Sequence, residues 1–207
     1  MKVVLYGASG NSGSRILSEL QSRGHDVTAV VRNPDKLPAG IKSVRDDLGD
    51  VERIAQIITG ADAVVSSYMP PHDDTDQLVA VISRLIEGVN KAGNPRLIVV
   101  GGAASLEIAP GLTLLSSGHL PAPWVPIATS HAKALELLKT SDVPWTYFSP
   151  AGFFEPGKRT GKFRLGKDQL ITDANGNSRI SFEDYAIALV DELEHPAHIR
   201  ERFTIGY

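Results

Sequence analysis

The chain has 207 residues, of which 42% are hydrophobic and 22% charged, and this composition is typical of a soluble globular protein. It contains no cysteine, which excludes disulfides, thiolate nucleophiles and zinc–thiolate sites and fits a cytoplasmic protein. The net charge of −3 and the short apolar runs argue against binding to nucleic acid or to a membrane, and no leader segment is recognised. We therefore expect a single domain over 1–207.

The first stretch predicts a buried strand, a tight turn and a helix. An apolar run over 3–6 leads into the turn 7–13, and a helical pattern follows. Gly7 allows a sharp turn, Gly10 leaves room for a pyrophosphate, and Gly13 lets the helix pack close to the strand. The free amides at the start of the helix would face the anion. This pattern favours a dinucleotide site over a purely structural turn. Its expected contacts are Gly7, Ser9, Gly10, Asn11, Ser12 and Gly13.

The second predicted strand, over 27–31, ends at Arg32. An acidic residue at this position would bind the ribose hydroxyls of NAD, whereas an arginine accommodates the 2′-phosphate of NADP. Arg32, helped by Lys36, therefore favours NADP(H) over NAD(H), although Asp35 weakens the preference. The alternative is that Arg32 is an ordinary solvent-exposed loop residue.

Three further strands continue the nucleotide side. After a strand over 41–44, Asp47 and Leu48 lie where a carboxylate can accept a hydrogen bond from the adenine amino group. Asp50 is a favoured N-cap for the helix 51–58. The strands over 61–67 and 96–102 are separated by an amphipathic helix from about 75 to 91. They contribute Ser66, Ser67 and Gly101 to the expected nucleotide contacts, and the stretch from Ser66 to Met69 should lie beside the nucleotide.

The segment 103–127 shows no periodicity and follows the carboxyl end of a parallel strand, where open α/β sheets bind ligands. The later elements are predicted as a helix over 129–140, a strand over 144–149, a small β meander over 163–180, a helix from 181 to about 194 and a strand over 202–205. Because strands and helices alternate, we expect a Rossmann-type, doubly wound α/β fold. Its sheet should be mainly parallel, with helices on both faces. The expected substrate-side elements are about 103–128 and 150–181.

Four side chains are candidate substrate contacts. His119 and Trp124 lie in the long loop, and Phe153 and Phe154 follow the carboxyl end of the strand 144–149. The alternative for His119 is a mobile surface position, and for the two phenylalanines it is core packing.

The likeness to a known family rests on five segments. They are Gly7-Ala8-Ser9-Gly10-Asn11-Ser12-Gly13, Val31-Arg32-Asn33-Pro34-Asp35-Lys36-Leu37, Asp47-Leu48, Val99-Val100-Gly101-Gly102-Ala103-Ala104-Ser105-Leu106 and Phe182-Glu183-Asp184-Tyr185-Ala186. Together they resemble the atypical short-chain dehydrogenase/reductases. Among these, the chain looks most like the compact bacterial NAD(P)H-binding proteins named as NADH-flavin reductases, which are related to biliverdin reductase B.

The chain departs from the family pattern at one position. Members that act on alcohols and ketones carry a Tyr and a Lys separated by three residues, and the phenol protonates the carbonyl. Here Lys133 is present, but Thr129 stands at the tyrosine position, and a threonine hydroxyl is too weak an acid for this role. In the flavin and biliverdin reductase branch a serine and a histidine lie near the nicotinamide instead. The resemblance thus implies Ser105, His131 and Lys133 as catalytic candidates; a turn cap for Ser105 and a surface position for His131 stay open.

These observations favour an NAD(P)H-dependent oxidoreductase that reduces a flavin or a similar planar conjugated acceptor by hydride transfer. In that scheme His131, with an ordinary pKa near ~6.5, would donate a proton. One alternative is an NADP(H)-sensing regulatory protein, and another is a nucleotide-sugar epimerase-like enzyme. His195 and His198 stand three apart without a third ligand nearby, so no metal site is predicted. The expected partner is a small-molecule acceptor, and the chain is expected to be a monomer or homodimer.

Overall fold

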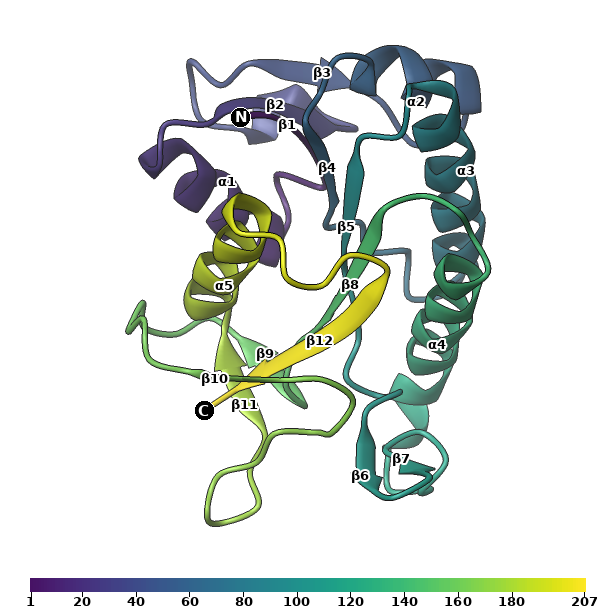
Figure 1. The fold of residues 1–207 in the computed structure, drawn as a ribbon, viewed down its shortest axis with the longest axis vertical. Helices are drawn as coiled ribbons and strands as arrows, with labels where there is room; N and C mark the ends of the chain where they lie inside the picture. The colour runs from purple at the N-terminus through teal and green to yellow at the C-terminus, as the bar shows by residue number, and fades with distance from the viewer.

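The computed structural model describes residues 1–207 and contains an eight-stranded sheet with helices on both faces (Figure 1). The strands, in their order across the sheet, are β3 (Ser43–Arg45), β2 (Asp26–Val31), β1 (Lys2–Tyr6), β4 (Ala63–Ser66), β5 (Arg96–Val100), β8 (Trp145–Ser149), β12 (Glu201–Gly206) and β10 (Arg164–Gly166). Every neighbouring pair is parallel except β10 with β12. This confirms the predicted Rossmann-type fold.

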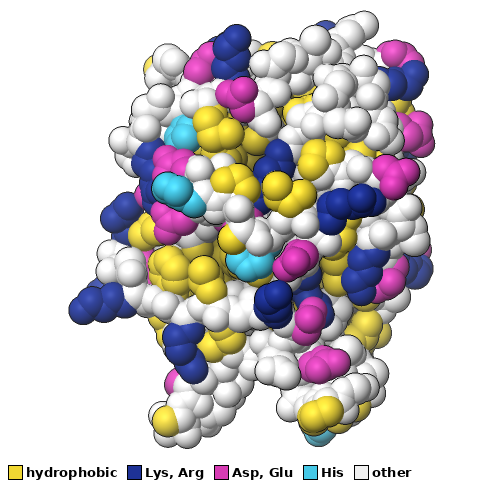
Figure 2. Space-filling model, in the orientation of Figure 1, with side chains coloured by type: hydrophobic (Ala, Val, Ile, Leu, Met, Phe, Trp, Pro, Cys, Tyr) yellow, Lys and Arg dark blue, Asp and Glu magenta, His cyan; other side chains and the backbone are white.

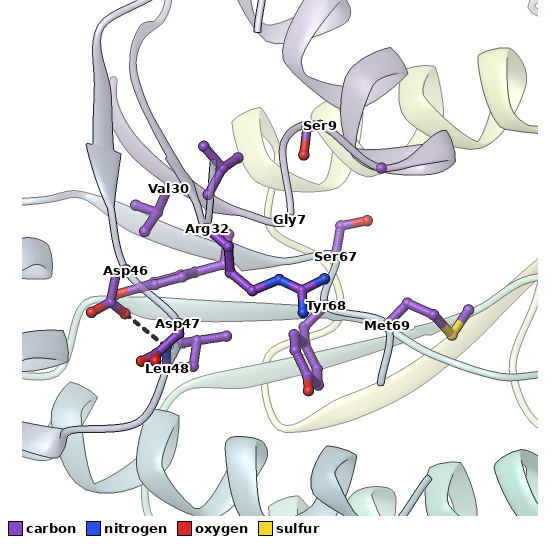
Figure 3. Close-up of a pocket in the computed structure, with 13 residues that line it drawn as sticks. Gly7, Ser9, Val30, Arg32, Asp46, Asp47, Leu48, Ser67, Tyr68 and Met69 are labelled. Carbon is purple, nitrogen blue, oxygen red and sulfur yellow. Dashed lines mark hydrogen bonds between the residues drawn. The ribbon is translucent and has the colours of Figure 1, made fainter. Parts of the chain in front are cut away.

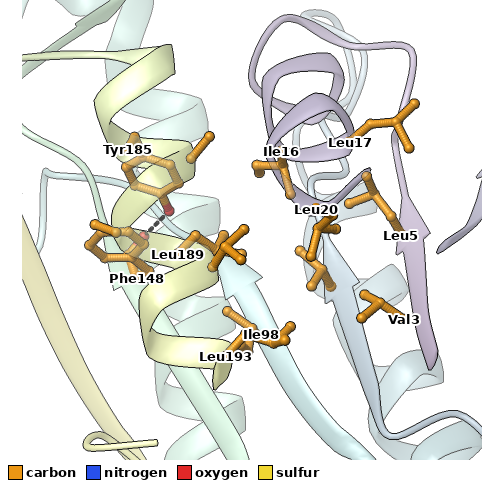
Figure 4. Packing of buried hydrophobic residues seen from close by; sticks show 14 of the residues in the cluster. Val3, Leu5, Ile16, Leu17, Leu20, Ile98, Phe148, Tyr185, Leu189 and Leu193 are labelled. Atoms are coloured by element: carbon orange, nitrogen blue, oxygen red, sulfur yellow. Dashed lines mark hydrogen bonds between the residues drawn. The ribbon is translucent and has the colours of Figure 1, made fainter. Parts of the chain in front are cut away.

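Helices α1 (Asn11–Ser22) and α5 (Phe182–Glu194) cover one face of the sheet, and α2 (Val51–Ile58), α3 (Gln77–Lys91) and α4 (Val125–Lys139) cover the other. The alternation of side chains along β1 explains both layers. Val3 and Leu5 enter the core under α1 and α5, part of which Figure 4 shows, while Val4 and Tyr6 enter the opposite core. A strand buried on both faces needs this continuous apolar run.

Helix ends follow the local sequence signals. The Asp50 side chain accepts a hydrogen bond from the amide of Glu52, which confirms the predicted N-cap, and the Ser181 side chain caps α5 by accepting one from the amide of Asp184. After α1, Gly24 has a φ of +77° and the amide of His25 bonds back to Leu20, as in a glycine-terminated helix. None of the helices combines the length and apolar character that crossing a lipid bilayer requires.

Two predicted boundaries are wrong. The third strand is Ser43–Arg45 rather than 41–44. Helix α4 begins at Val125 rather than Thr129, because Pro126 occupies its first turn, where the missing amide costs nothing. The segment 103–127 is also less irregular than its sequence indicates. It contains a hairpin of β6 (Glu107–Ala109) and β7 (Leu112–Thr113), and a short 3₁₀ helix, η2 (Ala122–Trp124).

The short strands near the C-terminus are present but do not form a meander. Strand β10 joins the main sheet antiparallel to β12, and β11 (Arg179–Ser181) pairs in parallel with β9 (Phe153–Glu155). A tight turn lies between β10 and β11, where the amide of Gly176 bonds to the carbonyl of Asp173. A tight turn is a local signal, whereas the choice of strand partner depends on distant segments.

Candidate functional site

The candidate site lies where the strand order of the sheet reverses, at the carboxyl ends of β1 and β4. The chain moves outward from β1 to β2 and β3, then returns past β1 to β4, and such a switch point opens a crevice. A pocket lies there (Figure 3). Nine of its lining residues were predicted from the sequence, namely Gly7, Ser9, Gly10, Arg32, Asp47, Leu48, Ser67, Tyr68 and Met69.

The glycine turn is shaped by close backbone contacts. Gly7 has a φ of +76°, and a Cβ on it would lie 2.3 Å from the carbonyl oxygen of Ser67. A Cβ on Gly13 would lie 2.1 Å from the carbonyl oxygen of Gly7. Both glycines are therefore required by sterics, because α1, β1 and β4 meet there backbone to backbone.

The start of α1 leaves backbone donors for a ligand. The first amide of the helix with a carbonyl partner is that of Ser14, which bonds to Gly10, so the amides of Asn11, Ser12 and Gly13 have no intrahelical acceptor. No side chain caps this end, and no acidic residue lies in the first turn. A phosphate fits such an end because both the amides and the helix dipole favour an anion.

The hydroxyls of Ser12 and Ser67 lie 2.8 Å apart and join α1 to the segment that leaves β4. Ser66, in contrast, is buried, and its hydroxyl has no partner and no solvent access. Its predicted contact with the nucleotide is therefore wrong for the side chain, because alternate residues of a strand face opposite ways.

Arg32 follows β2 and its guanidinium extends toward Tyr68 in the pocket (Figure 3). It is exposed and forms no ion pair within the protein, unlike most arginines of this chain. A free guanidinium beside a nucleotide pocket is suited to bidentate binding of a phosphate. Lys36 is also exposed, on the 3₁₀ helix η1 (Pro34–Lys36), but it does not line the pocket.

The third strand contributes two carboxylates to the pocket. Asp46 accepts a hydrogen bond from the amide of Leu48 at 3.0 Å, and Asp47 accepts one from Gly49 at 3.0 Å. Leu48 has a φ of +64°, which these bonds hold in place. Burial raises the pKa of Asp46, and the charge of Asp47 adds to the effect. Sequence reasoning assigned Asp47 and missed Asp46.

Beyond the pocket, two glycines follow β5, and the ring of a neighbouring side chain packs against each of them. A Cβ on Gly101 would lie 2.3 Å from the ring of Tyr147, and one on Gly102 would lie 2.9 Å from the ring of His131. The Tyr147 hydroxyl accepts the Gly102 amide at 3.0 Å and lies 3.2 Å from Nδ1 of His131. Burial lowers the pKa of His131 to about 4 and raises that of Tyr147 above its ordinary range. The imidazole is therefore neutral at pH 7.

A family model described as NAD(P)H-binding matches residues 7–196, which include the glycine turn, the pocket and α5. The chain belongs to this NAD(P)H-binding family. The protein YwnB of Bacillus subtilis is 42% identical over 210 residues, covering 99% of this chain and 98% of YwnB. The family assignment agrees with the resemblance found in the sequence.

Two solved structures share the whole fold of this family member. A proposed epimerase of Bacteroides thetaiotaomicron is 47% identical with a TM-score of 0.92, covering 100% of this chain and 96% of that one. A proposed NADH-flavin reductase of Streptococcus pneumoniae is 37% identical with a TM-score of 0.91, covering 100% and 99%. The fold is thus that of a nicotinamide-nucleotide-binding, oxidoreductase-like protein.

The three catalytic candidates form different contacts in this family member. The Ser105 hydroxyl accepts a hydrogen bond from Arg202 at 3.0 Å and forms none with His131. Lys133 is 56% exposed and pairs with Asp76 at 3.3 Å. Two positions apart on α4, Lys133 and His131 point in different directions. Of the three, only His131 lies against the glycines that end β5.

The four substrate candidates are divided between the surface and the core. Trp124 and Phe153 are exposed, at 57% and 58%, and Arg179 lies over the Phe153 ring. His119 is exposed in the loop that follows the β6–β7 hairpin. Phe154 instead packs against the rings of Phe182 and Tyr185 beneath α5, so it belongs to the core.

Several pocket residues were not assigned from the sequence. They are Tyr6, Val30, Val31 and Asp46. Each is one of the last two residues of a predicted strand or lies within two residues after its end, so treating those positions as pocket candidates would have found them. No group of three or more His, Asp or Glu side chains is arranged to hold a metal ion. His198 pairs with Glu192 and stacks on Phe203.

Proposed function

We propose that this protein is an NADPH-dependent reductase that passes a hydride to a flavin or a similar planar conjugated acceptor. When bound, reduced nicotinamide supplies the hydride and the two electrons. The protein has to hold the nucleotide, align the acceptor and exclude water. The Streptococcus pneumoniae relative, named as a proposed NADH-flavin reductase, supports the acceptor class. We also propose a cytoplasmic location and a monomer or homodimer.

The nucleotide contacts follow from the pocket. The uncapped amides at the start of α1 would hold the pyrophosphate, and Ser9 and Ser12 flank them. Asp46, Asp47 and Leu48 would lie at the adenine. Arg32, with Lys36 further out, would meet the 2′-phosphate, which supports a preference for NADP(H) over NAD(H).

The proposed acceptor class rests on one observation: the polar side chains of α4 offer no acid that could protonate a carbonyl oxygen. The Thr129 hydroxyl donates to the carbonyl of Val125 at 2.8 Å, Lys133 pairs with Asp76, and His131 is neutral at pH 7. A ketone or an aldehyde needs an acid to protonate its oxygen as the hydride arrives. A planar conjugated acceptor delocalises the added charge and takes its proton from water, so it suits these residues better. Neutral His131 is too weak an acid to be the proton donor, so we assign that role to water.

The Bacteroides thetaiotaomicron relative, named as a proposed epimerase, favours a second candidate function. Epimerases of the short-chain dehydrogenase type oxidise and reduce a sugar hydroxyl, which needs the acid–base tyrosine that Thr129 replaces. The third candidate, an NADP(H)-sensing regulatory protein, would bind nucleotide through the same contacts without turnover.

Steady-state oxidation of NADPH with FMN, FAD, riboflavin, quinones and ketones tests the reductase. NMR of a nucleotide sugar incubated with the nucleotide-loaded protein tests the epimerase, because epimerisation is redox-neutral and consumes no NADPH. We expect turnover with flavins or quinones only. Tight NADPH binding without turnover of any acceptor would favour the regulatory protein, and turnover of a nucleotide sugar would favour the epimerase.

Arg32→Ala tests the nucleotide assignment. Loss of a charge-assisted bond costs about 1.5–3 kcal/mol, so NADPH affinity should fall about 10–100-fold while NADH affinity stays nearly unchanged. Arg200→Ala is the matched control, because Arg200 is also exposed but lies before the amino end of β12, bonded to Ser141 and Asp142. An unchanged ratio of NADPH to NADH affinity in Arg32→Ala would refute the NADP(H) preference.

A further inference from the structure

The hydroxyl of Tyr147 lies at the centre of a small polar cluster between β5, β8 and α4. Tyr147 is fully buried on β8, in register with Val99 of β5. Its hydroxyl oxygen has three neighbours within hydrogen-bond distance: the amide of Gly102 at 3.0 Å, the carbonyl oxygen of His131 at 3.1 Å and Nδ1 of His131 at 3.2 Å. No other side chain bonds to His131.

The number of protons available in this cluster determines which ring nitrogen of His131 is protonated. A tyrosine hydroxyl donates once and accepts at two lone pairs. The Gly102 amide donates to one lone pair, and the hydroxyl proton is directed at the carbonyl of His131. The second lone pair then faces Nδ1, and this third bond forms only if Nδ1 carries a proton. If Nδ1 were unprotonated, the hydroxyl would have to give up the carbonyl to reach it, so the cluster would keep two bonds instead of three.

The other ring nitrogen of His131 lies on the open side. Nε2 has no partner within the protein, yet it is not among the polar atoms that are shut off from solvent. The ring rests on Gly102, whose missing Cβ makes room for it. Burial alone shifts the pKa of His131, and Arg202, the nearest charge acting on Tyr147, is a cation, so no carboxylate stabilises an imidazolium here.

We propose that Tyr147 is a positioning residue, which holds neutral His131 with its proton on Nδ1 and so presents the Nε2 lone pair at the carboxyl edge of β5. A ligand group that meets Nε2 must then be a donor, an N–H or an O–H. This rests on the proposed function only in taking that ligand to be the electron acceptor. The arrangement of protons itself depends on no substrate.

Nitrogen-15 NMR of the imidazole rings tests this directly, because it distinguishes a protonated from an unprotonated ring nitrogen in each histidine. The chain has six histidines, and His131→Gln identifies the signals of His131 as those that disappear. In the wild-type protein at pH 7 we expect a neutral ring with the proton on Nδ1. A proton on Nε2, or a charged ring, would overturn the proposal.

Tyr147→Phe tests the positioning role, because it removes one oxygen and keeps the buried ring. We expect the Nδ1–H signal to be lost in favour of Nε2–H or of an exchanging mixture. Tyr185→Phe is the matched control: Tyr185 is equally buried, and its hydroxyl donates to the carbonyl of Phe148 at 2.7 Å without contacting His131. An unchanged Nδ1–H signal in Tyr147→Phe would refute the role of Tyr147.

The wild-type spectrum needs no acceptor to bind, and the only variant used to read it, His131→Gln, serves to assign the signals. A protein that turns over no flavin but shows Nδ1–H would refute the proposed function and keep this inference. A protein that reduces flavin but shows Nε2–H would do the reverse.

Discussion

Gly7 and Gly101 each follow a central parallel strand, and at both a Cβ would lie 2.3 Å from a neighbouring atom. At Gly7 that atom is the backbone carbonyl oxygen of Ser67, whereas at Gly101 it belongs to the side chain of Tyr147. The nucleotide side is thus shaped by main chain, which cannot move without moving two strands. The end of β5, where we propose that the acceptor binds, is shaped by rings, so its shape depends on which side chains β8 and α4 provide. This difference explains why the nucleotide is easier to infer than the acceptor.

The largest effect should come from a methyl group added on the nucleotide side. Gly7→Ala should lose about 3 kcal/mol or more of unfolding free energy, because it adds a clash to an unfavourable φ. Gly24→Ala is the matched control, since Gly24 has nearly the same φ, +77°, but no atom within 4 Å of its added Cβ. It should lose only about 1 kcal/mol. Gly101→Ala should fall between them. Urea unfolding measures all three, and equal losses for Gly7→Ala and Gly24→Ala would contradict the backbone contact.

The partly buried imidazole of His131 should be visible in the pH dependence of stability. The pKa of His131 is about 4 in the folded protein and about 6.5 in the unfolded chain, so the unfolded chain takes up the proton first. The contribution of neutral His131 to the free energy of unfolding is therefore fully present above pH 6.5 and is lost as the pH falls toward 4. Between pH 7 and pH 5 we expect a loss of about 1–2 kcal/mol in urea unfolding, and a smaller loss in His131→Gln. Equal losses in both proteins would show that His131 titrates normally.

The exposed rings of Trp124 and Phe153, on the proposed acceptor side, should affect the KM for the acceptor and not the stability of the fold. Trp124→Ala and Phe153→Ala should change the unfolding free energy by less than about 1 kcal/mol, because both side chains are largely in solvent. If they stack on a planar acceptor, its KM should rise about 5–10-fold. Ile199→Ala is a control at a comparable exposure of 50%, in the segment before β12. A KM unchanged in both aromatic variants would remove these residues from the site.

The smallest effect should come from Lys133. Its ion pair with Asp76 is exposed at both ends, so Lys133→Ala should cost at most about 0.5 kcal/mol. The kcat for NADPH oxidation should stay within about twofold of wild type. A hundredfold loss of kcat would instead support the catalytic role for Lys133 that the family pattern implies.

The parts of the site that the sequence predicted depend on neighbours along the chain. The turn of Gly7, the cap at Asp50 and the position of Arg32 after a strand are all visible within a few residues. The pairs Ser105–Arg202 and His131–Tyr147 join segments that lie far apart in the sequence, so no local pattern indicates them.

The same reasoning explains the errors in the fold. Pro126 lies inside the predicted loop 103–127, although a proline fits the first turn of α4 equally well. The pairing of β10 with β12 and of β11 with β9 joins segments distant in the sequence, which local composition does not specify. Fold class was predictable because it needs only the alternation of strands and helices.

The central claim is that the nucleotide held at the glycine turn reduces an acceptor lying over the carboxyl end of β5. Its most direct test is a single-turnover stopped-flow measurement in which the NADPH-bound protein is mixed with FMN or riboflavin. The account predicts oxidation of bound NADPH at a rate that saturates with flavin, slower with NADH at equal concentration. Bound NADPH that stays reduced at saturating flavin and quinone would contradict it.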